Sequence, residues 1–269
     1  MQSSYYLLFR KCDKMGGRGA SAGLTISAGS GTTTQPQQPP EPQKPKTASE
    51  AKDMAELRQV IKDTLGVELG KSLDTIDFGL VKQAAEDLEF FSKEFPQWAG
   101  TIKKIQTRQL GSSTNAQTNG TNITLSKQQY GNPTAFATRV ANATSRHYYP
   151  EGTTNKTTAV HEMGHTFEQA MIDKIMPEDG TPMRRYDRIM AWNKGVYSGK
   201  IILEAVKAAK KTPEGKGKLN SQLISDVSGY ATTRRSETLA ECVRDYYINK
   251  DKAQPLSKEV WKILKREFG

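Results

Sequence analysis

The chain has 269 residues, enough for one large domain or two small ones, but its apolar share of 35% is low for a chain folded throughout. Thirty-nine basic and 29 acidic residues give a net charge of +10, which could help the protein approach nucleic acid or another anionic surface. A solvated lysine-rich surface is the favoured alternative. The two cysteines, Cys12 and Cys242, lie far apart and predict neither a disulfide framework nor a cysteine metal cluster.

The sequence also argues against a single-strand nucleic-acid binder, a membrane-spanning protein and a secreted protein. No basic stretch carries the interleaved aromatic residues of a single-strand binder, so nucleic acid is not an expected partner. No apolar run reaches the length of about 18 residues that a membrane span needs, so none is expected. Apolar residues 5–9 precede Arg10 and Lys11, the reverse of the order in a signal peptide, so we expect no secretory signal.

Composition divides the chain into a tail and a domain. Residues 15–47 are rich in Gly, Ser and Thr and then in Pro and Gln, which is typical of disorder. We therefore predict a disordered tail over 1–47 and a folded domain over 48–269, whose first part, 48–98, is helical.

Apolar residues at helical spacing predict a first helix near 48–67, with Thr47 or Ser49 as its N-cap. A second amphipathic helix fits 74–95 and ends before Pro96.

Two short strands are expected next, over 101–108 and 121–127, with Asn119-Gly120 as the turn before the second. Residues 131–152 are expected to be mostly loop with a short helical piece. Later helices are expected around the HEMGH sequence and over 199–211, 236–250 and 256–268. Helices dominate beside a small twisted sheet, so the predicted fold class is α+β.

The HEMGH sequence carries the strongest chemical signal. On a helix, His161 and His165 share one face and can hold a single metal ion, and neutral imidazole nitrogens suit zinc. Glu162, beside the first ligand, can take a proton from a water at the metal and pass it to a leaving amine. The alternative is a chance match or a core helix with surface histidines, but the chain has only three histidines and two complete the motif. Gly164 costs roughly 0.8–1 kcal/mol in a helix relative to alanine, which a close backbone neighbour would explain.

A catalytic zinc ion usually has three protein ligands, so a third is required. His147 lies in a loop-like segment and is the weaker candidate. Glu237 and Glu241 share one face of a largely apolar helix, where buried carboxylates need partners. We predict that Glu237 binds the metal and that Glu241 holds a ligand imidazole through its free N–H. A solvated acidic face is the alternative.

HEMGH followed by an E-x-x-x-E helix resembles the gluzincin arrangement of zinc metallopeptidases. Residues 229–247, GYATTRRSETLAECVRDYY, resemble the corresponding stretch of the anthrax lethal factor family. The resemblance covers about residues 95–262 and implies a zincin-like catalytic domain, one Zn2+ ion per chain and a protein or peptide substrate. It also implies that residues 120–131 form the edge strand before the motif helix. In that family a tyrosine seven residues before the ligand glutamate stabilises the oxyanion, and Tyr230 holds that position here.

The chain departs from this family by a longer insertion between His165 and Glu237, so the resemblance does not determine the substrate cleft or its specificity. The head of the chain, MGGRGASAGL at 15–24, is similar to tails on proteins encoded by phages and other mobile elements of Gram-positive bacteria. A plain linker is the alternative. The resemblance implies Met15 as the start, phage structural proteins as partners, and a location in a bacterial cytoplasm or with a phage particle.

Our leading hypothesis is a zinc metalloendopeptidase. The alternative is a non-catalytic structural or binding component of a phage-like particle that keeps a zincin-like fold. The intact Glu162 argues against it, because a structural site needs no base. Nucleic-acid binding rests on charge alone. Arg234 and Arg235 could meet a substrate carboxylate or simply lie at the surface. The roles assigned are metal ligands His161, His165 and Glu237, base and acid Glu162, oxyanion donor Tyr230, and ligand orientation by Glu241.

Overall fold

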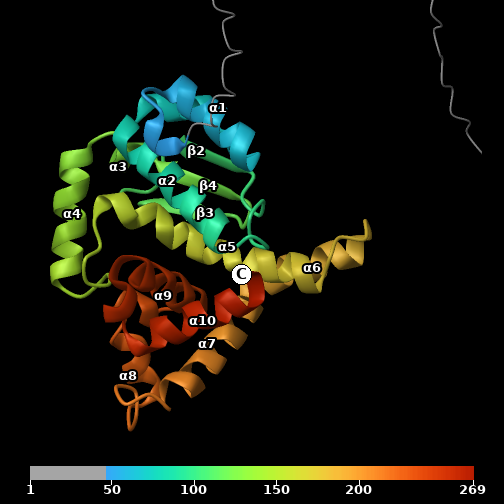
Figure 1. Ribbon diagram of the computed structural model, residues 1–269, viewed down its shortest axis with the longest axis vertical. Helices are drawn as coiled ribbons and strands as arrows, with labels where there is room; N and C mark the ends of the chain where they lie inside the picture. Colours follow the sequence, from blue (N-terminus) through green and yellow to red (C-terminus); the bar gives the residue numbers. More distant parts are fainter. Residues whose placement is uncertain (1–46) are drawn as a thin grey trace, which may run out of the picture. The chain divides into compact units, whose positions relative to one another are not determined.

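A computed structural model of the protein describes residues 47–269 (Figure 1). Residues 1–46, which make up nearly all of the predicted tail and include Cys12 and Met15, lie outside the described residues. The mostly helical α+β class with a small sheet is confirmed. The helices are η1 (Ala48–Glu50), α1 (Met54–Leu65), η2 (Lys71–Thr75), α2 (Phe78–Glu94), α3 (Lys127–Tyr130), α4 (Pro133–Ser145), η3 (Asn155–Thr157), α5 (Thr158–Ile175), α6 (Pro182–Lys194), α7 (Val196–Ala209), α8 (Asn220–Ser225), η4 (Tyr230–Thr232), α9 (Arg235–Asn249), η5 (Lys250–Lys252) and α10 (Pro255–Phe268). The strands are β1 (Glu68–Leu69), β2 (Lys104–Arg108), β3 (Ala116–Thr118) and β4 (Asn122–Ser126).

The first long helix begins later than the sequence pattern suggested. The side chain of Asp53 accepts hydrogen bonds from the backbone N–H groups of Ala55 and Glu56 and caps α1. Thr47 instead begins the single turn η1, because the extended backbone at Ala51 separates that turn from α1. The N-cap predicted for α1 was therefore wrong.

The sheet has the strand order β1-β2-β4-β3. β1, β2 and β4 run parallel, and β3 pairs antiparallel with β4. β4 therefore lies inside the sheet, with Ile123 and Leu125 fully buried, and the expectation that residues 120–131 form the edge strand was wrong. The edge strand beside β4 is β3, whose three residues lack an apolar alternation that would reveal a strand. Gly120, at a φ of +97°, turns the chain from β3 to β4.

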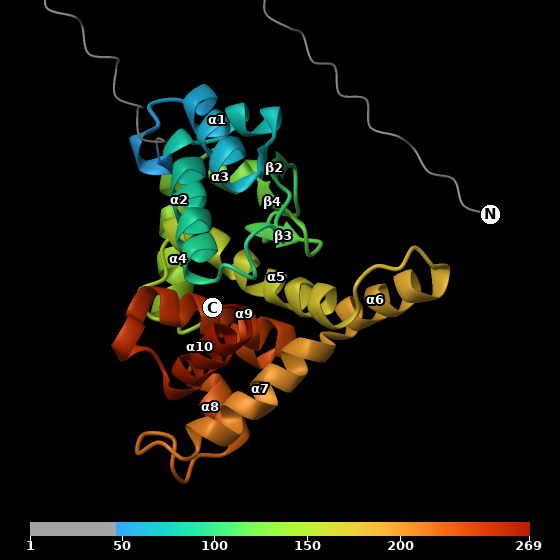
Figure 2. The ribbon, with the colours of Figure 1, turned by 45° about the vertical axis from the view of Figure 1, so that its right-hand side comes forward.

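Four α-helices, namely α3, α4, α6 and α8, are longer than the sequence analysis expected or were not predicted by it. Residues 131–152 hold the 13-residue helix α4, which Asn132 caps and Pro133 opens. The insertion between the motifs contains α6 and α8. α6 extends away from the other helices in both ribbon views (Figures 1 and 2).

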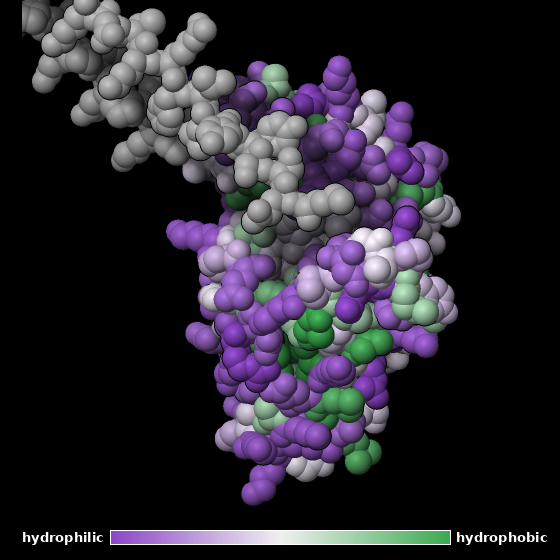
Figure 3. Space-filling view, turned by 90° about the vertical axis from the view of Figure 1, so that its right-hand side faces the viewer, coloured by the Kyte–Doolittle hydropathy of each residue, from purple (hydrophilic) through white to green (hydrophobic). Residues whose placement is uncertain are grey.

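α6 leaves a row of apolar side chains exposed, namely Met183, Tyr186 and Ile189. Figure 3 views the molecule from the side toward which α6 points and shows apolar groups gathered among hydrophilic ones. In residues 47–269, no helix combines the length and hydropathy that crossing a bilayer requires.

α5 is the central element. It runs between the sheet with α1 and α2 on one side and α7, α9 and α10 on the other (Figures 1 and 2). Phe167 packs edge-on against Phe95, with ring centroids 5.0 Å apart, and the buried indole N–H of Trp98 donates to Thr166 Oγ1 at 2.9 Å. These contacts hold α5 in a solid core and so fix the face that carries the two motif histidines.

Candidate metal centre

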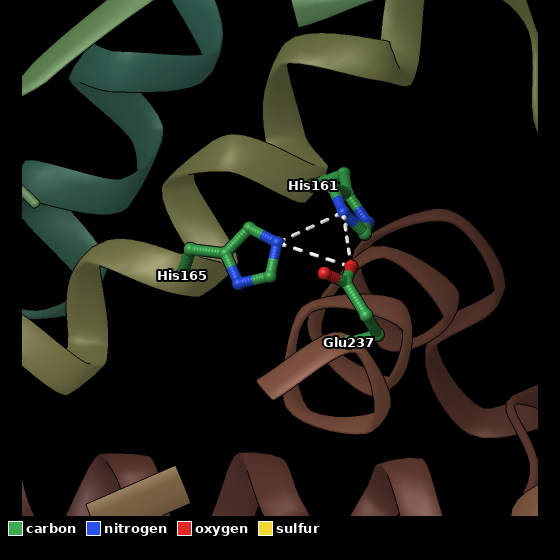
Figure 4. A group of neighbouring side chains, drawn as sticks. All are labelled: His161, His165 and Glu237. Carbon is green, nitrogen blue, oxygen red and sulfur yellow. Dashed lines mark hydrogen bonds and ion pairs between the residues drawn. The ribbon is translucent and has the colours of Figure 1, made fainter. Parts of the chain in front are cut away.

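The two motif histidines and one glutamate meet in space. His161 and His165 project from one face of α5, and Glu237 projects toward them from the first turn of α9 (Figure 4). The two Nε2 atoms lie 3.0 Å apart, and Glu237 Oε2 lies 3.1 Å from Nε2 of His161 and 3.2 Å from Nε2 of His165. These three residues form a group that could hold a metal ion.

The proton on the His161 ring is placed by its other neighbour. Nδ1 of His161 lies 2.6 Å from Oε1 of Glu241. Burial alone would raise the pKa of Glu241, but Arg244 and His161 hold that pKa below its usual range. An ionised carboxylate only accepts hydrogen bonds, so Nδ1 of His161 carries the proton and donates it. In the neutral ring the lone pair is then on Nε2, which faces Glu237 and His165.

This convergence of lone pairs requires a cation. Glu237 Oε2 is buried, and the two imidazole nitrogens lie 3.1 and 3.2 Å from it. A buried carboxylate oxygen between two imidazole nitrogens is stable only if a proton or a metal ion lies between them. Two imidazole nitrogens and one carboxylate oxygen are a donor set that suits Zn2+ and leaves a coordination position open. The residues present therefore fit a zinc ion.

Without a metal, the carboxylates of Glu237 and Glu241 keep a second proton on the His161 ring. Burial alone would lower the pKa of His161, but Glu237 and Glu241 outweigh it and raise that pKa to about 9. Burial would raise the pKa of Glu237, yet the two imidazoles hold it well below its usual range. Metal and proton therefore compete for this site.

A buried network supports Glu241 behind His161. Ser228 Oγ donates to Glu241 Oε2 at 2.8 Å and accepts from the N–H of Ala231 at 3.0 Å. Arg244, whose side chain is 2% exposed, pairs with Glu241 Oε1. The sequence pattern missed both partners. Arg244 could have been found from its spacing of three residues after Glu241, whereas Ser228 lies in a loop with no such signal.

The ligands line a cavity of about 350 Å³ together with Glu162 and Tyr230. Glu162 is 7% exposed. The ring of Tyr230 stacks on that of His161, with centroids 5.6 Å apart. Burial, followed by the charge of Glu237, raises the pKa of Tyr230, so its phenol keeps its proton as a hydrogen-bond donor. The remaining lining comes from β3, α5, α6 and the start of α9: Ala116, Gln117, Thr118, Glu168, Trp192, Asn193, Arg234 and Ser236.

The structure brings the predicted site residues together and leaves other candidates outside. His147 donates from Nε2 to the carbonyl oxygen of Ser225 at 2.9 Å and is not part of the metal-binding group. Arg234 lines the cavity, whereas Arg235 points to the carbonyl oxygen of Gly199 on α7. Of the two arginines, only Arg234 is placed to meet a ligand.

Comparison of the chain with protein-family models, with curated proteins and with solved structures found no match. What is established is a candidate metal site of His161, His165 and Glu237 in a mostly helical α+β fold.

Proposed function

We propose that this protein is a zinc-dependent metalloendopeptidase of the gluzincin type. The observation that carries the proposal is the buried Oε2 of Glu237, which lies within 3.2 Å of two imidazole nitrogens and in the same cavity as Glu162. A site that served structure alone would gain nothing from an additional carboxylate facing the cavity. The resemblance of HEMGH and of residues 229–247 to the anthrax lethal factor family supports the same chemistry.

A bound zinc ion would act as a Lewis acid and lower the pKa of a water molecule. Glu162 takes the proton of the attacking water and returns it to the leaving amine. Tyr230, protonated because of its burial, donates its O–H to the oxyanion that develops on the carbonyl. Glu241 holds the proton on Nδ1 of His161 and keeps Nε2 free as a ligand.

The edge strand β3 gives a peptide a place to bind. The carbonyl oxygen of Asn115 accepts from the N–H of Ser126 at 2.9 Å, and the N–H of Asn119 donates to the carbonyl oxygen of Asn122 at 3.2 Å. Because such bonds alternate along an antiparallel pair, the N–H and C=O groups of Ala116 and Thr118 point away from β4. Both residues line the metal cavity. An extended substrate can therefore add to the sheet at β3 and present its backbone to Glu162.

The test compares zinc-loaded wild type with Glu162→Gln on a peptide library derived from a proteome. We expect wild type to cleave internal peptide bonds, and the variant to bind zinc equally while cleaving about 10²–10⁴-fold more slowly. If zinc-loaded wild type cleaves nothing, the peptidase proposal fails and a binding or structural role becomes the better account. Equal cleavage by both proteins would reject the role of Glu162.

A further inference from the structure

The metal cavity continues into a longer groove. A second cavity of about 340 Å³ also contains His161, Glu162 and Tyr230 in its lining. It shares Tyr148 and Tyr149 with a third cavity of about 580 Å³, beside α4. The metal cavity itself reaches α6 through Trp192 and Asn193. α4 and α6 lie on opposite sides of α5 in Figure 1, so the groove offers room on both sides of the bond that is cut.

The wall of the third cavity is held by a strained and well-bonded segment. His147 adopts a φ of +55°, which is uncommon for a residue with a side chain. The carbonyl oxygen of His147 accepts from the N–H of Gly229 at 2.8 Å, and that of Tyr148 accepts from Tyr230 at 3.0 Å. The rings of Tyr148 and Tyr230 consequently lie 5.3 Å apart. Strain of this kind persists where the surroundings enforce it and often marks a binding site.

Tyr149 is held by contacts with Arg244 and Asn115. Its ring lies over the guanidinium of Arg244, 4.5 Å from the ring centroid, and its hydroxyl accepts from Asn115 Nδ2 at 3.1 Å. Val140 and Ala143 of α4 line the same cavity. Two tyrosine rings and two aliphatic side chains together make a preformed, largely apolar pocket, which suits a large apolar side chain.

The same pocket carries positive charge. Arg139 and Arg146 both line it. Arg139 donates to the carbonyl oxygen of Ser112 and to Asn115 Oδ1, and Arg146 donates to the carbonyl oxygen of Asn142. All three acceptors are neutral, and neither arginine forms an ion pair with any residue within 47–269. Their charge is available to an anionic ligand.

We propose that the pocket beside α4 determines substrate specificity, and that the substrate is a protein segment with a large apolar residue close to the cleaved bond and an acidic residue beside it. This inference rests on the proposed peptidase function. The apolar side chain enters between Tyr149 and Ala143, and the acidic neighbour meets Arg139 or Arg146. Charge complementarity and the preformed apolar walls together define this class of substrate.

The test is the cleavage profile of the zinc-loaded full chain on a proteome-derived peptide library, determined by mass spectrometry. In wild type we expect large apolar residues to be enriched at one position within about two residues of the cut, with Asp or Glu enriched next to it. Ala143→Phe fills the pocket and should shift that position to small residues. Ala141→Phe, on the exposed part of the same helix, should leave the profile unchanged.

The predicted preference for an acidic substrate residue is tested with the double variant Arg139→Gln and Arg146→Gln. This variant should lose the preference for Asp or Glu and keep the preference for a large apolar residue. Arg108→Gln, an exposed arginine at the end of β2, is the matched control. Circular dichroism and zinc content establish that each variant is folded, and Ala143→Leu serves if Ala143→Phe is not. Cleavage that depends on Glu162 but shows no apolar or acidic enrichment, or enrichment unchanged by filling the pocket, overturns the specificity proposal and leaves the peptidase standing. No cleavage at all rejects both.

Discussion

The position that a Cβ atom would take on Gly164 lies 2.7 Å from the Cα of Ala240. α5 and α9 therefore touch backbone to backbone at the centre of the HEMGH motif. This contact explains why a residue unfavourable in helices occupies that position. It also sets the distance between the helices, and with it the approach of Glu237, one turn before Ala240, to His161.

Gly164→Ala should separate the two helices. Because the added methyl group meets main-chain atoms, we expect a loss of about 1–3 kcal/mol in unfolding free energy and a lower zinc content. Gly199→Ala, in helix α7, is the matched control, since its new Cβ would lie 3.5 Å from the nearest atom, Cδ of Arg235. That change should be neutral or stabilising by up to about 1 kcal/mol. Urea unfolding and zinc analysis measure both, and equal behaviour of the two variants would contradict the close-contact account.

Glu241→Gln should weaken metal binding without removing a ligand. The amide can still accept from Nδ1 of His161, but it loses the negative charge and leaves Arg244 without its ion pair. We expect zinc affinity to fall about 10–100-fold. Competition with a fluorescent chelator measures this, and an unchanged affinity would show that Glu241 does not support His161.

Tyr230→Phe should affect the reaction and spare the metal. The ring remains stacked on His161, so zinc affinity should not change. Loss of the donated O–H should lower kcat by about 10²–10³-fold, with little change in KM. Steady-state kinetics on a peptide from the library decide the matter. A variant with full kcat would remove Tyr230 from the mechanism.

Zinc binding should depend on pH through His161. Its folded-state pKa of about 9 lies above the ordinary value of 6.5, so the metal-free site holds a proton at pH 7. In the metal-free protein the resulting stabilisation is complete below pH 6.5 and is lost as pH rises through about 9. Zinc must displace this proton, so its affinity should rise by about tenfold per pH unit across that window and then level off.

Calorimetry in buffers of different ionisation enthalpy measures the protons released on zinc binding. About one proton should leave at pH 7, about half a proton near pH 9, and progressively less at higher pH. Proton release that does not decline over this range would place the titrating group elsewhere.

Sequence patterns predict this protein well where a local signal is strong. The helices around HEMGH and Glu237 have apolar faces at helical spacing, and both occur as α5 and α9. The two short segments before them became β2 and β4. In these elements the apolar residues repeat at the spacing of a helix or a strand, so no tertiary information is needed to recognise them.

The features of the fold and the site that sequence patterns did not predict depend on contacts between residues far apart in the chain. β3 is a strand only because it pairs with β4, and its three residues show no period. The edge position was assigned to the wrong strand because strand order is set by tertiary packing. Asp53 displaced Thr47 as the cap of α1, a choice between two competent residues that sequence does not resolve. Ser228 reaches Glu241 from a loop, and no local spacing signals such a contact.

Zinc content per chain tests the central claim most directly. After removal of metal by chelation and reloading, wild type and His147→Asn should each hold about one zinc ion, since the third histidine lies outside the site and asparagine tolerates its positive φ. His165→Asn and Glu237→Ala, which each remove a predicted ligand, should hold almost none. A wild type that binds no zinc, or a His165→Asn variant that keeps a full complement, would contradict the assignment of His161, His165 and Glu237 as a metal centre.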